Sequence, residues 1–261
     1  MKYNLTAFSA KDIGGRNEQQ DSVIHRVSPN NKNAMLVLAD GMGGHSGGAV
    51  GSSCIISAAK EEWQHYLKST TPKKTLNTIL RQAANCMNKL EKENNISPRS
   101  TFVALLLKDT IAYYAHLGDS RLYHFRQGKL LTKTKDHSVV QMLVDMGNLP
   151  EEEMTTHEDQ SKLLKWVGGK THEPSFNEVE IAAGDIFLLC SDGLWEYVSI
   201  KKMEAAFQQS SNNLESLVNS LITQAKKAGE DKGDNISIAL LTIEKKHKES
   251  QFRKILNTFI K

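Results

Sequence analysis

Three apolar runs joined by very short turns constrain the fold of this chain more than any other feature of its sequence. Residues 101–107, 111–117 and 121–126 each have the length and the apolar content of a buried β-strand. The connections, around residues 108–109 and 118–120, carry Asp, Gly or Ser, which turns favour. Because connections this short leave no room for a crossover helix, neighbouring strands are expected to pair antiparallel.

The rest of the chain extends this pattern to an α+β fold. Apolar residues recur every three or four positions in residues 47–68 and again from Pro72 to Leu90, which predicts two long helices. Further strands are expected at 4–10, 22–27, 35–39, 185–190 and 236–243, and further helices at 138–147, 200–207 and 213–227. This order of elements favours antiparallel sheets covered by helices.

The composition is typical of a globular protein from a reducing compartment. With 261 residues, of which 39% are hydrophobic, the chain can bury a core as one large domain or two small ones. Its apolar runs are far shorter than the roughly 20 residues that span a bilayer, and its N-terminus lacks the apolar stretch of a signal peptide. Three cysteines without a C-x-x-C pair argue against a disulfide framework, so we expect a cytoplasmic protein. Trp166 is expected to face the core because of its bulk.

Positive charge is concentrated at the end of the chain. Residues 245–261 hold six Lys or Arg and one Glu, so they contribute +5 to a total of +3, and the remainder sums to −2. The body is therefore not expected to bind nucleic acid. From Phe252 to Ile260 the apolar residues repeat at three and four positions, as in an amphipathic helix. We divide the chain into a domain at 1–244 and this tail, which packs on its own domain, forms a dimer contact or lies on an anionic membrane.

Four aspartates stand beside glycine at the ends of apolar runs: Asp40, Asp119, Asp192 and Asp234. Any one of them alone is most simply a turn residue. Together they would place several carboxylates where buried strands meet solvent, which suits hard divalent cations that prefer oxygen ligands. No His or Cys pattern competes, so Mg²⁺ or Mn²⁺ is favoured over Zn²⁺.

Arg16 follows two glycines and precedes Asp21, which stands at the start of the next strand-like run, by five positions. Its planar guanidinium can bind a phosphate group through paired donors. The alternative is a solvated arginine in a loop.

These residues fall into motifs that resemble the metal-dependent protein phosphatases of the protein phosphatase 2C type, particularly the compact bacterial members. The resemblance extends from about Phe8 to Ile243, and its seven motifs occur in the order of the family. They are Arg16…Gln20-Asp21, Asp40–Gly44, Leu117–Arg121, Lys135–Ser138, His157–Gly168, Ser191–Leu194 and Gly233–Asn235.

The resemblance implies a fold and an activity. The fold is two antiparallel β-sheets packed as a sandwich with helices on both outer faces, an αββα arrangement of four layers. The activity is hydrolysis of phosphoserine and phosphothreonine in proteins by a serine/threonine phosphatase with two Mn²⁺ or Mg²⁺ ions and without a phosphoenzyme intermediate. The substrates would be phosphoproteins made by a serine/threonine kinase, and the enzyme would be a monomer.

The resemblance also implies a ligand set for the metals. Asp40 is expected to bridge two metals, and the carbonyl of Gly41 to bind one of them. Asp192 and Asp234 are expected to hold the other. Asp119, together with Asp192, matches the third metal position of bacterial members.

The resemblance also implies roles for residues that are not metal ligands. Arg16 is expected to hold the substrate phosphate, and Gln20 and Asp21 to orient water around the metals. Met42 stands where many eukaryotic members have a histidine proposed as general acid, so the acid is left unassigned. His45 is either a substitute for that acid or a residue that positions the following helix.

Three rival functions remain beside this interpretation. The first is a catalytically silent scaffold that binds phosphoproteins, although such proteins tend to lose the metal-binding acids that this chain retains. The second is a two-metal hydrolase of small phosphoesters. The third is membrane or nucleic-acid binding through the tail as the main task.

Overall fold

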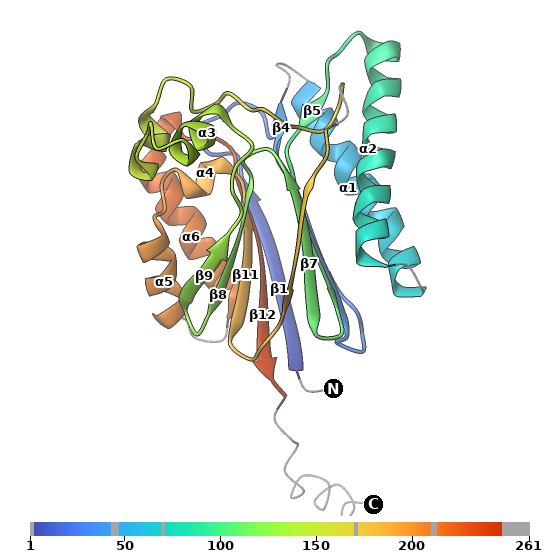
Figure 1. Ribbon diagram of the computed structural model, residues 1–261, viewed down its shortest axis with the longest axis vertical. Helices are drawn as coiled ribbons and strands as arrows, with labels where there is room; N and C mark the ends of the chain where they lie inside the picture. Colours follow the sequence, from blue (N-terminus) through green and yellow to red (C-terminus); the bar gives the residue numbers. More distant parts are fainter. Residues whose placement is uncertain (1–2, 43–46, 69–70, 170–171, 210–212, 247–261) are drawn as a thin grey trace, which may run out of the picture.

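The computed structural model describes residues 3–42, 47–68, 71–169, 172–209 and 213–246. Two five-stranded sheets pack face to face, and helices cover the outer face of each (Figure 1). Every pair of neighbouring strands in both sheets is antiparallel. The α+β sandwich that the sequence predicts is therefore confirmed.

One sheet contains both ends of the described chain. Its strands, in spatial order, are β1 (Tyr3–Asp12), β12 (Ile236–Lys245), β11 (Asp185–Cys190), β8 (Arg121–Arg126) and β9 (Lys129–Lys133). β1 and β12 pair over ten residues, which ties the first strand of the fold to the last.

The other sheet contains the hairpin that the short turns predict. Its strands, in spatial order, are β10 (Ser175–Glu180), β7 (Ile111–Leu117), β6 (Phe102–Lys108), β3 (Asn33–Ala39) and β2 (Ser22–Val27). A separate two-stranded ladder joins β4 (Gly41–Met42) to β5 (Arg99–Ser100).

Buried side chains form three apolar layers because successive residues of a strand point to opposite faces. In β3, Leu36 and Leu38 point between the two sheets, whereas Met35 and Val37 point to the outer helices. All four side chains are fully buried. A strand covered on both faces is apolar throughout, as the sequence of β3 is.

Helices α1 (Gly47–Lys68) and α2 (Pro72–Asn94) cover the sheet that contains β3. The helix α2 begins as the sequence predicts, with the Thr71 side chain accepting a hydrogen bond from the backbone N–H of Lys74 and with Pro72 in the first turn. Helices α4 (Asp192–Trp195), α5 (Ile200–Gln209) and α6 (Leu214–Gly229) cover the other sheet. The short elements α3 (Val139–Asp145), η1 (Glu151–Thr156) and η2 (Glu230–Lys232) complete the described structure.

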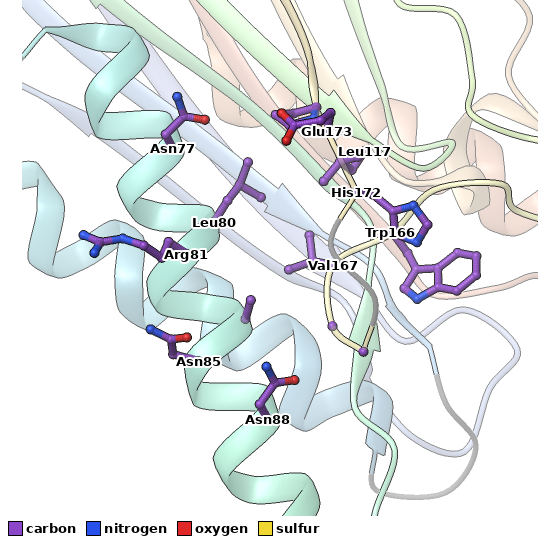
Figure 2. Close-up of a pocket in the computed structure, with 14 residues that line it drawn as sticks. Asn77, Leu80, Arg81, Asn85, Asn88, Leu117, Trp166, Val167, His172 and Glu173 are labelled. Atoms are coloured by element: carbon purple, nitrogen blue, oxygen red, sulfur yellow. The ribbon is translucent and has the colours of Figure 1, made fainter.

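The sequence reading missed the two edge strands β9 and β10 and the single turn α4. The edge strands are short and partly exposed, so they carry no strong apolar pattern. The expected core position of Trp166 is also wrong. Its side chain is partly exposed and lines a groove beside α2, next to the ring of His172 (Figure 2).

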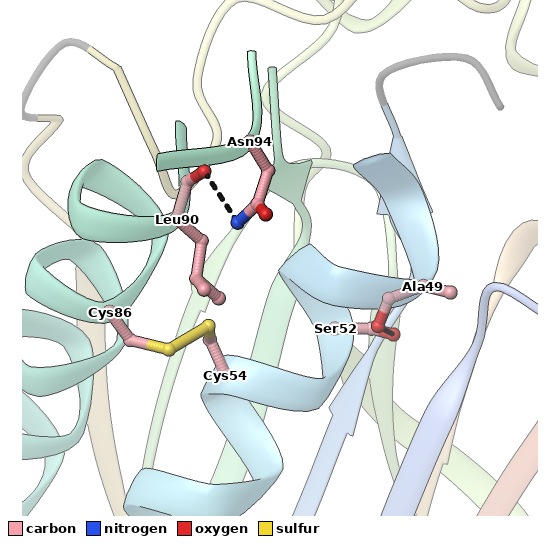
Figure 3. The surroundings of a disulfide bond; sticks show 6 residues. All are labelled: Ala49, Ser52, Cys54, Cys86, Leu90 and Asn94. Carbon is pink, nitrogen blue, oxygen red and sulfur yellow. Dashed lines mark hydrogen bonds between the residues drawn. A yellow bond between two sulfur atoms is a disulfide. The ribbon is translucent and has the colours of Figure 1, made fainter. Parts of the chain in front are cut away.

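The argument from the sequence against disulfides is corrected as well. Cys54 of α1 and Cys86 of α2 form a disulfide that joins the two helices (Figure 3), and Cys190 is free and buried. The two partners are 32 residues apart, and only the packing of α1 against α2 brings them together. An odd cysteine count without a C-x-x-C pair therefore did not exclude one bridge.

No helix in the described ranges is both long enough and apolar enough to cross a membrane. All but the first two residues of the tail lie outside the described residues, which end at residue 246. The expected division at residue 244 and the amphipathic role of the tail stay predictions.

Candidate active site

A cavity of about 210 Å³ gathers the residues that the sequence selected from five separate segments. Its lining comprises Arg16, Gln20, Asp40, Gly41, Met42, Asp119, Ser161, Leu163, Asp192, Asp234 and Asn235. All four aspartates and Arg16 therefore face one cavity. Asp21 lies behind it, buried, and accepts a hydrogen bond of 2.7 Å from the hydroxyl of Ser191.

The backbone of Asp40 is fixed where β3 ends. Its N–H donates to the hydroxyl of Thr101 at 2.9 Å, and its carbonyl accepts from the Thr101 N–H and the Ser100 hydroxyl, both at 2.8 Å. Gly41 follows, and a Cβ there would lie 2.0 Å from the carbonyl oxygen of Gly48 in α1. Glycine is therefore required at this position, because β4 and the first turn of α1 lie too close for a side chain.

The loop that carries Arg16 is held against Asp234 by backbone contacts. Gly14 has φ 61°, and a Cβ there would lie 2.0 Å from the carbonyl oxygen of Asp234. The N–H of Gly15 donates to the carbonyl of Gly233 at 2.8 Å. The two glycines before Arg16 thus allow the close approach that brings its side chain to the cavity.

Asn235 joins the same loop to the strand β12. Its amide donates to the carbonyls of Ile13 and Glu18 at 2.8 and 3.0 Å, and its side-chain oxygen accepts from the Gln20 N–H at 2.7 Å. From the sequence, Asn235 is identified only as part of a motif and without a role of its own. Its position directly after the candidate ligand Asp234 was the signal for this role in the sequence.

Like charges gathered in a cavity raise the pKa values of the carboxyls. Burial, followed by the charges of neighbouring aspartates, raises the pKa of Asp40 and of Asp192 well above the usual range. Burial raises the pKa of Asp21 and of Asp119 to about 7. A cation in the cavity would offset both the burial of these carboxylates and their mutual repulsion, and it would therefore lower their pKa values.

Glu196 is a further acid that the sequence reading missed. Burial and the charge of Asp234 raise its pKa to about 7. It follows Asp192 by four residues, and its N–H donates to the carbonyl of Asp192. Because positions four apart share one side of a helix, the spacing was a signal that could have found it.

Asp119 is supported by a buried stack of three side chains. The indole N–H of Trp195 donates to the carbonyl of Asp119 at 3.0 Å. The guanidinium of Arg121 lies 3.6 Å from the centre of the Trp195 ring and forms two hydrogen bonds, of 2.8 and 2.7 Å, with Asp136. Asp136 precedes the segment that leads into α3, so the stack connects that segment to the cavity.

The donor set fits hard divalent cations. One carboxylate oxygen of Asp192, Oδ1, is buried without a hydrogen-bond partner in the described ranges, although buried polar atoms are normally paired. No group of three or more His, Cys, Asp or Glu side chains among the described residues is arranged to hold a metal by itself. The mutual effect on the pKa values nevertheless places these carboxyls in one electrostatic cluster. Mg²⁺ and Mn²⁺ use few carboxylates and complete their coordination with water and carbonyl oxygens. A cluster of acids that does not form a complete metal site from side chains alone is therefore compatible with these ions.

Arg16 is bound to a carboxylate in this structure. Its guanidinium forms an ion pair of 2.6 Å with Asp234, and its side chain is 59% exposed. The exposed side chain can turn toward a ligand without disturbing the core. His45 lies outside the described residues.

Comparisons with known proteins agree with this fold. The family model described as protein phosphatase 2C matches residues 12–227. The chain is 36% identical over 180 residues to the serine/threonine protein phosphatase PstP of Mycobacterium tuberculosis, a match that covers 67% of this chain but only 34% of that protein. It is 31% identical over 251 residues to the protein phosphatase PhpP of Streptococcus pneumoniae, which covers 91% of this chain and 97% of PhpP.

Solved structures show the same relationship. The crystal structure of M. tuberculosis PstP/Ppp superposes with a TM-score of 0.78 at 31% identity, over 92% of this chain and 99% of the other. The PstP catalytic domain in complex with two manganese ions gives a TM-score of 0.78 at 29% identity, over 93% and 99%. By its matched sequence, its fold and its motifs, the chain belongs to the protein phosphatase 2C family.

Proposed function

We propose that this protein hydrolyses phosphoserine and phosphothreonine in phosphoprotein substrates, with two Mn²⁺ or Mg²⁺ ions in the cavity described above. The single observation that carries the proposal is the convergence of four aspartates and Arg16 on one cavity. Membership of the protein phosphatase 2C family, and a relative whose structure contains two manganese ions, support it.

The proposed metal ligands are the side chains of Asp40, Asp192 and Asp234 and the carbonyl of Gly41. A third ion, held by Asp119 and Asp192, is part of the proposal. When bound, such cations supply an acidified water molecule and offset the negative charge of the phosphoryl group. A cation bound beside Asp40 and Asp192 would offset the burial and the repulsion between carboxylates that raise their pKa values.

The remaining residues act on the substrate and on water. Arg16 binds the phosphate oxygens through its paired N–H donors once it leaves Asp234. Gln20 and the buried Asp21 orient water at the back of the cavity. Asn235 holds the loop that carries Arg16 and Gln20 in place.

Two other functions make different use of the same site. A silent scaffold that binds phosphoproteins has no need for acids that repel one another in one cavity, so the retained acids argue against it. A hydrolase of small phosphoesters would keep the metals but would show no preference for peptides.

The test is hydrolysis of a phosphothreonine peptide by the purified full chain with Mn²⁺, with Mg²⁺ and with EDTA. Asp40→Asn and Asp192→Asn are each expected to lower kcat/KM at least about a hundredfold, because each removes a ligand charge. Asp109→Asn is the matched control, since Asp109 is an exposed turn residue with φ 57° at the opposite end of β7 from Asp119. Absence of turnover by folded wild-type protein that binds Mn²⁺ would favour the scaffold. Equal turnover of small phosphoesters and peptides would favour the small-molecule hydrolase.

A further inference from the structure

A groove beside the cavity has no role in the proposed chemistry. It lies between α2 and residues 166–169 and 172–174, and it encloses about 270 Å³. Figure 2 shows the helix on one side of this groove and Trp166 and His172 on the other. It opens to solvent and is larger than the cavity of about 210 Å³ that holds the aspartates.

The helix side of the groove carries three asparagines, Asn77, Asn85 and Asn88. All three are exposed, and none makes a side-chain hydrogen bond within the described ranges. Asparagine is a weak helix former, so three in the middle of one helix face need a reason other than helix stability. Each side-chain amide offers two donors and one acceptor group, which match the carbonyl and N–H groups of a polypeptide backbone.

The floor of the groove is apolar, with Leu80, Leu117 and Val167 contributing to it. At its edge, the indole N–H of Trp166 is buried and has no acceptor in the part of the chain that the structure describes. An apolar floor flanked by unused donors and acceptors is the combination that an extended peptide with one apolar side chain would fill.

The groove lies close to the proposed active site. Gly41 pairs with Ser100, and Ser100 exchanges backbone hydrogen bonds of 3.1 and 2.8 Å with Val167, so three segments lie side by side from the cavity to the groove. Neighbouring extended segments lie about 5 Å apart, so two such spacings put the cavity and the groove about 10 Å from each other. On the other side, Leu117 of the groove is two residues from Asp119 of the cavity. At about 3.3 Å per residue, an extended chain covers this distance in about three to five residues.

We infer that this groove binds the polypeptide of a phosphoprotein substrate. An apolar side chain about three to five residues from the phosphorylated residue occupies the floor, and the asparagine amides bind the backbone on either side of it. This inference rests on the proposed function, because it assigns the substrate of the same active site.

The test uses the full chain with Asn77→Ala, Asn85→Ala and Asn88→Ala combined. Alanine is the better helix former at exposed positions, so this variant is expected to fold at least as well as the wild type. The matched control is Asn219→Ala, an exposed asparagine on α6 that covers the other sheet. A second variant, Ala84→Leu, fills the floor of the groove without removing a polar group.

Two labelled phosphothreonine peptides are compared. The long one carries apolar residues three to five positions from the phosphothreonine on both sides, and the short one ends one residue away on each side. Binding is measured by fluorescence anisotropy in EDTA, where no turnover is expected, and hydrolysis is measured separately in Mn²⁺ together with p-nitrophenyl phosphate.

The triple variant is expected to bind the long peptide about tenfold more weakly, since several hydrogen bonds of ordinary strength are lost. Its binding of the short peptide and its turnover of p-nitrophenyl phosphate are expected to match the wild type. Equal binding of the long peptide by variant and wild type, or equal loss for both peptides, would overturn the inference. If no phosphoester is hydrolysed in Mn²⁺, the proposed function fails, and the anisotropy data still decide whether the groove binds peptide.

Discussion

Replacing Asp119 by asparagine is expected to stabilise the metal-free protein while it weakens metal binding. Asp119 is only 8% exposed, and burial together with the charge of Asp136 raises its pKa to about 7 from the usual 3.8. A raised pKa in the folded state means that the folded protein binds more protons than the unfolded chain. The contribution of this group to stability is therefore present at low pH and is lost as the pH rises from about 4 to about 7.

The magnitude follows from the size of the shift. Three pKa units at about 1.4 kcal/mol each give an upper limit of about 4 kcal/mol that the ionised carboxylate costs the folded state at pH 8. Because the other acids of the cavity relax when one charge is removed, we expect Asp119→Asn to gain about 2 to 4 kcal/mol in EDTA at pH 8. At pH 5 Asp119 is largely protonated in the folded state, and the gain is expected to fall by about 2 kcal/mol.

The assay is urea unfolding of the full chain followed by circular dichroism, in EDTA at pH 8 and at pH 5. Asp145→Asn is the control, because Asp145 is an exposed carboxylate that pairs with Lys135, and its loss is expected to cost no more than about 0.5 kcal/mol. Added Mn²⁺ is expected to stabilise the wild type more than Asp119→Asn. If the variant is no more stable than the wild type in EDTA at pH 8, or if its gain is the same at both pH values, the electrostatic account of the cavity is wrong.

Three further predictions concern other parts of the structure. Trp195→Phe keeps an aromatic ring beneath Arg121 but removes the donor to the Asp119 carbonyl, so the free energy of unfolding is expected to fall by about 1 kcal/mol. Isothermal titration should also show weaker Mn²⁺ binding, and an unchanged Mn²⁺ affinity would contradict a positioning role for Trp195. Arg16→Lys loses the planar pair of donors and is expected to raise KM for phosphopeptides about tenfold while Mn²⁺ affinity is retained, and an unchanged KM would exclude phosphate binding by this residue. Cys54→Ala opens the loop of 32 residues closed by Cys86 and is expected to lower the free energy of unfolding by about 3 to 4 kcal/mol under oxidising conditions only; an equal loss in dithiothreitol would mean that packing, not the bridge, is responsible.

The sequence predicted the sheets better at their centres than at their edges. The short turn at residues 108–109 correctly predicted the antiparallel pairing of β6 with β7. The prediction that β7 pairs with β8 across residues 118–120 was wrong, because β8 belongs to the opposite sheet. A turn of three residues can lead the chain from one layer of the sandwich to the other, and nothing in its length distinguishes this from a hairpin. The edge strand β10 was missed because its side chains are half-exposed and follow no clear alternation.

In the candidate site, the sequence predicted the positions of single residues but not the contacts between distant ones. Each of the four aspartates could be located at the end of an apolar run from the sequence, and the family motifs grouped them. The residues that support them, Trp195, Arg121 and Asp136, occur in motifs, but their stacking and ion pair depend on how α4 packs against β8. Likewise, the ion pair between Arg16 and Asp234 joins residues 218 positions apart.

By itself, the sequence determined the local properties of this protein: strands that are apolar on one face or both, the helix start at Thr71, and glycines where backbones must come close. These follow from interactions within a few residues, which composition and spacing record directly. The tertiary structure alone decided the sheet to which β8 belongs, the bridge between Cys54 and Cys86, and the groove between α2 and Trp166. Contacts between distant segments depend on which apolar faces pack together, and many packings are compatible with one local pattern until the whole core is assembled.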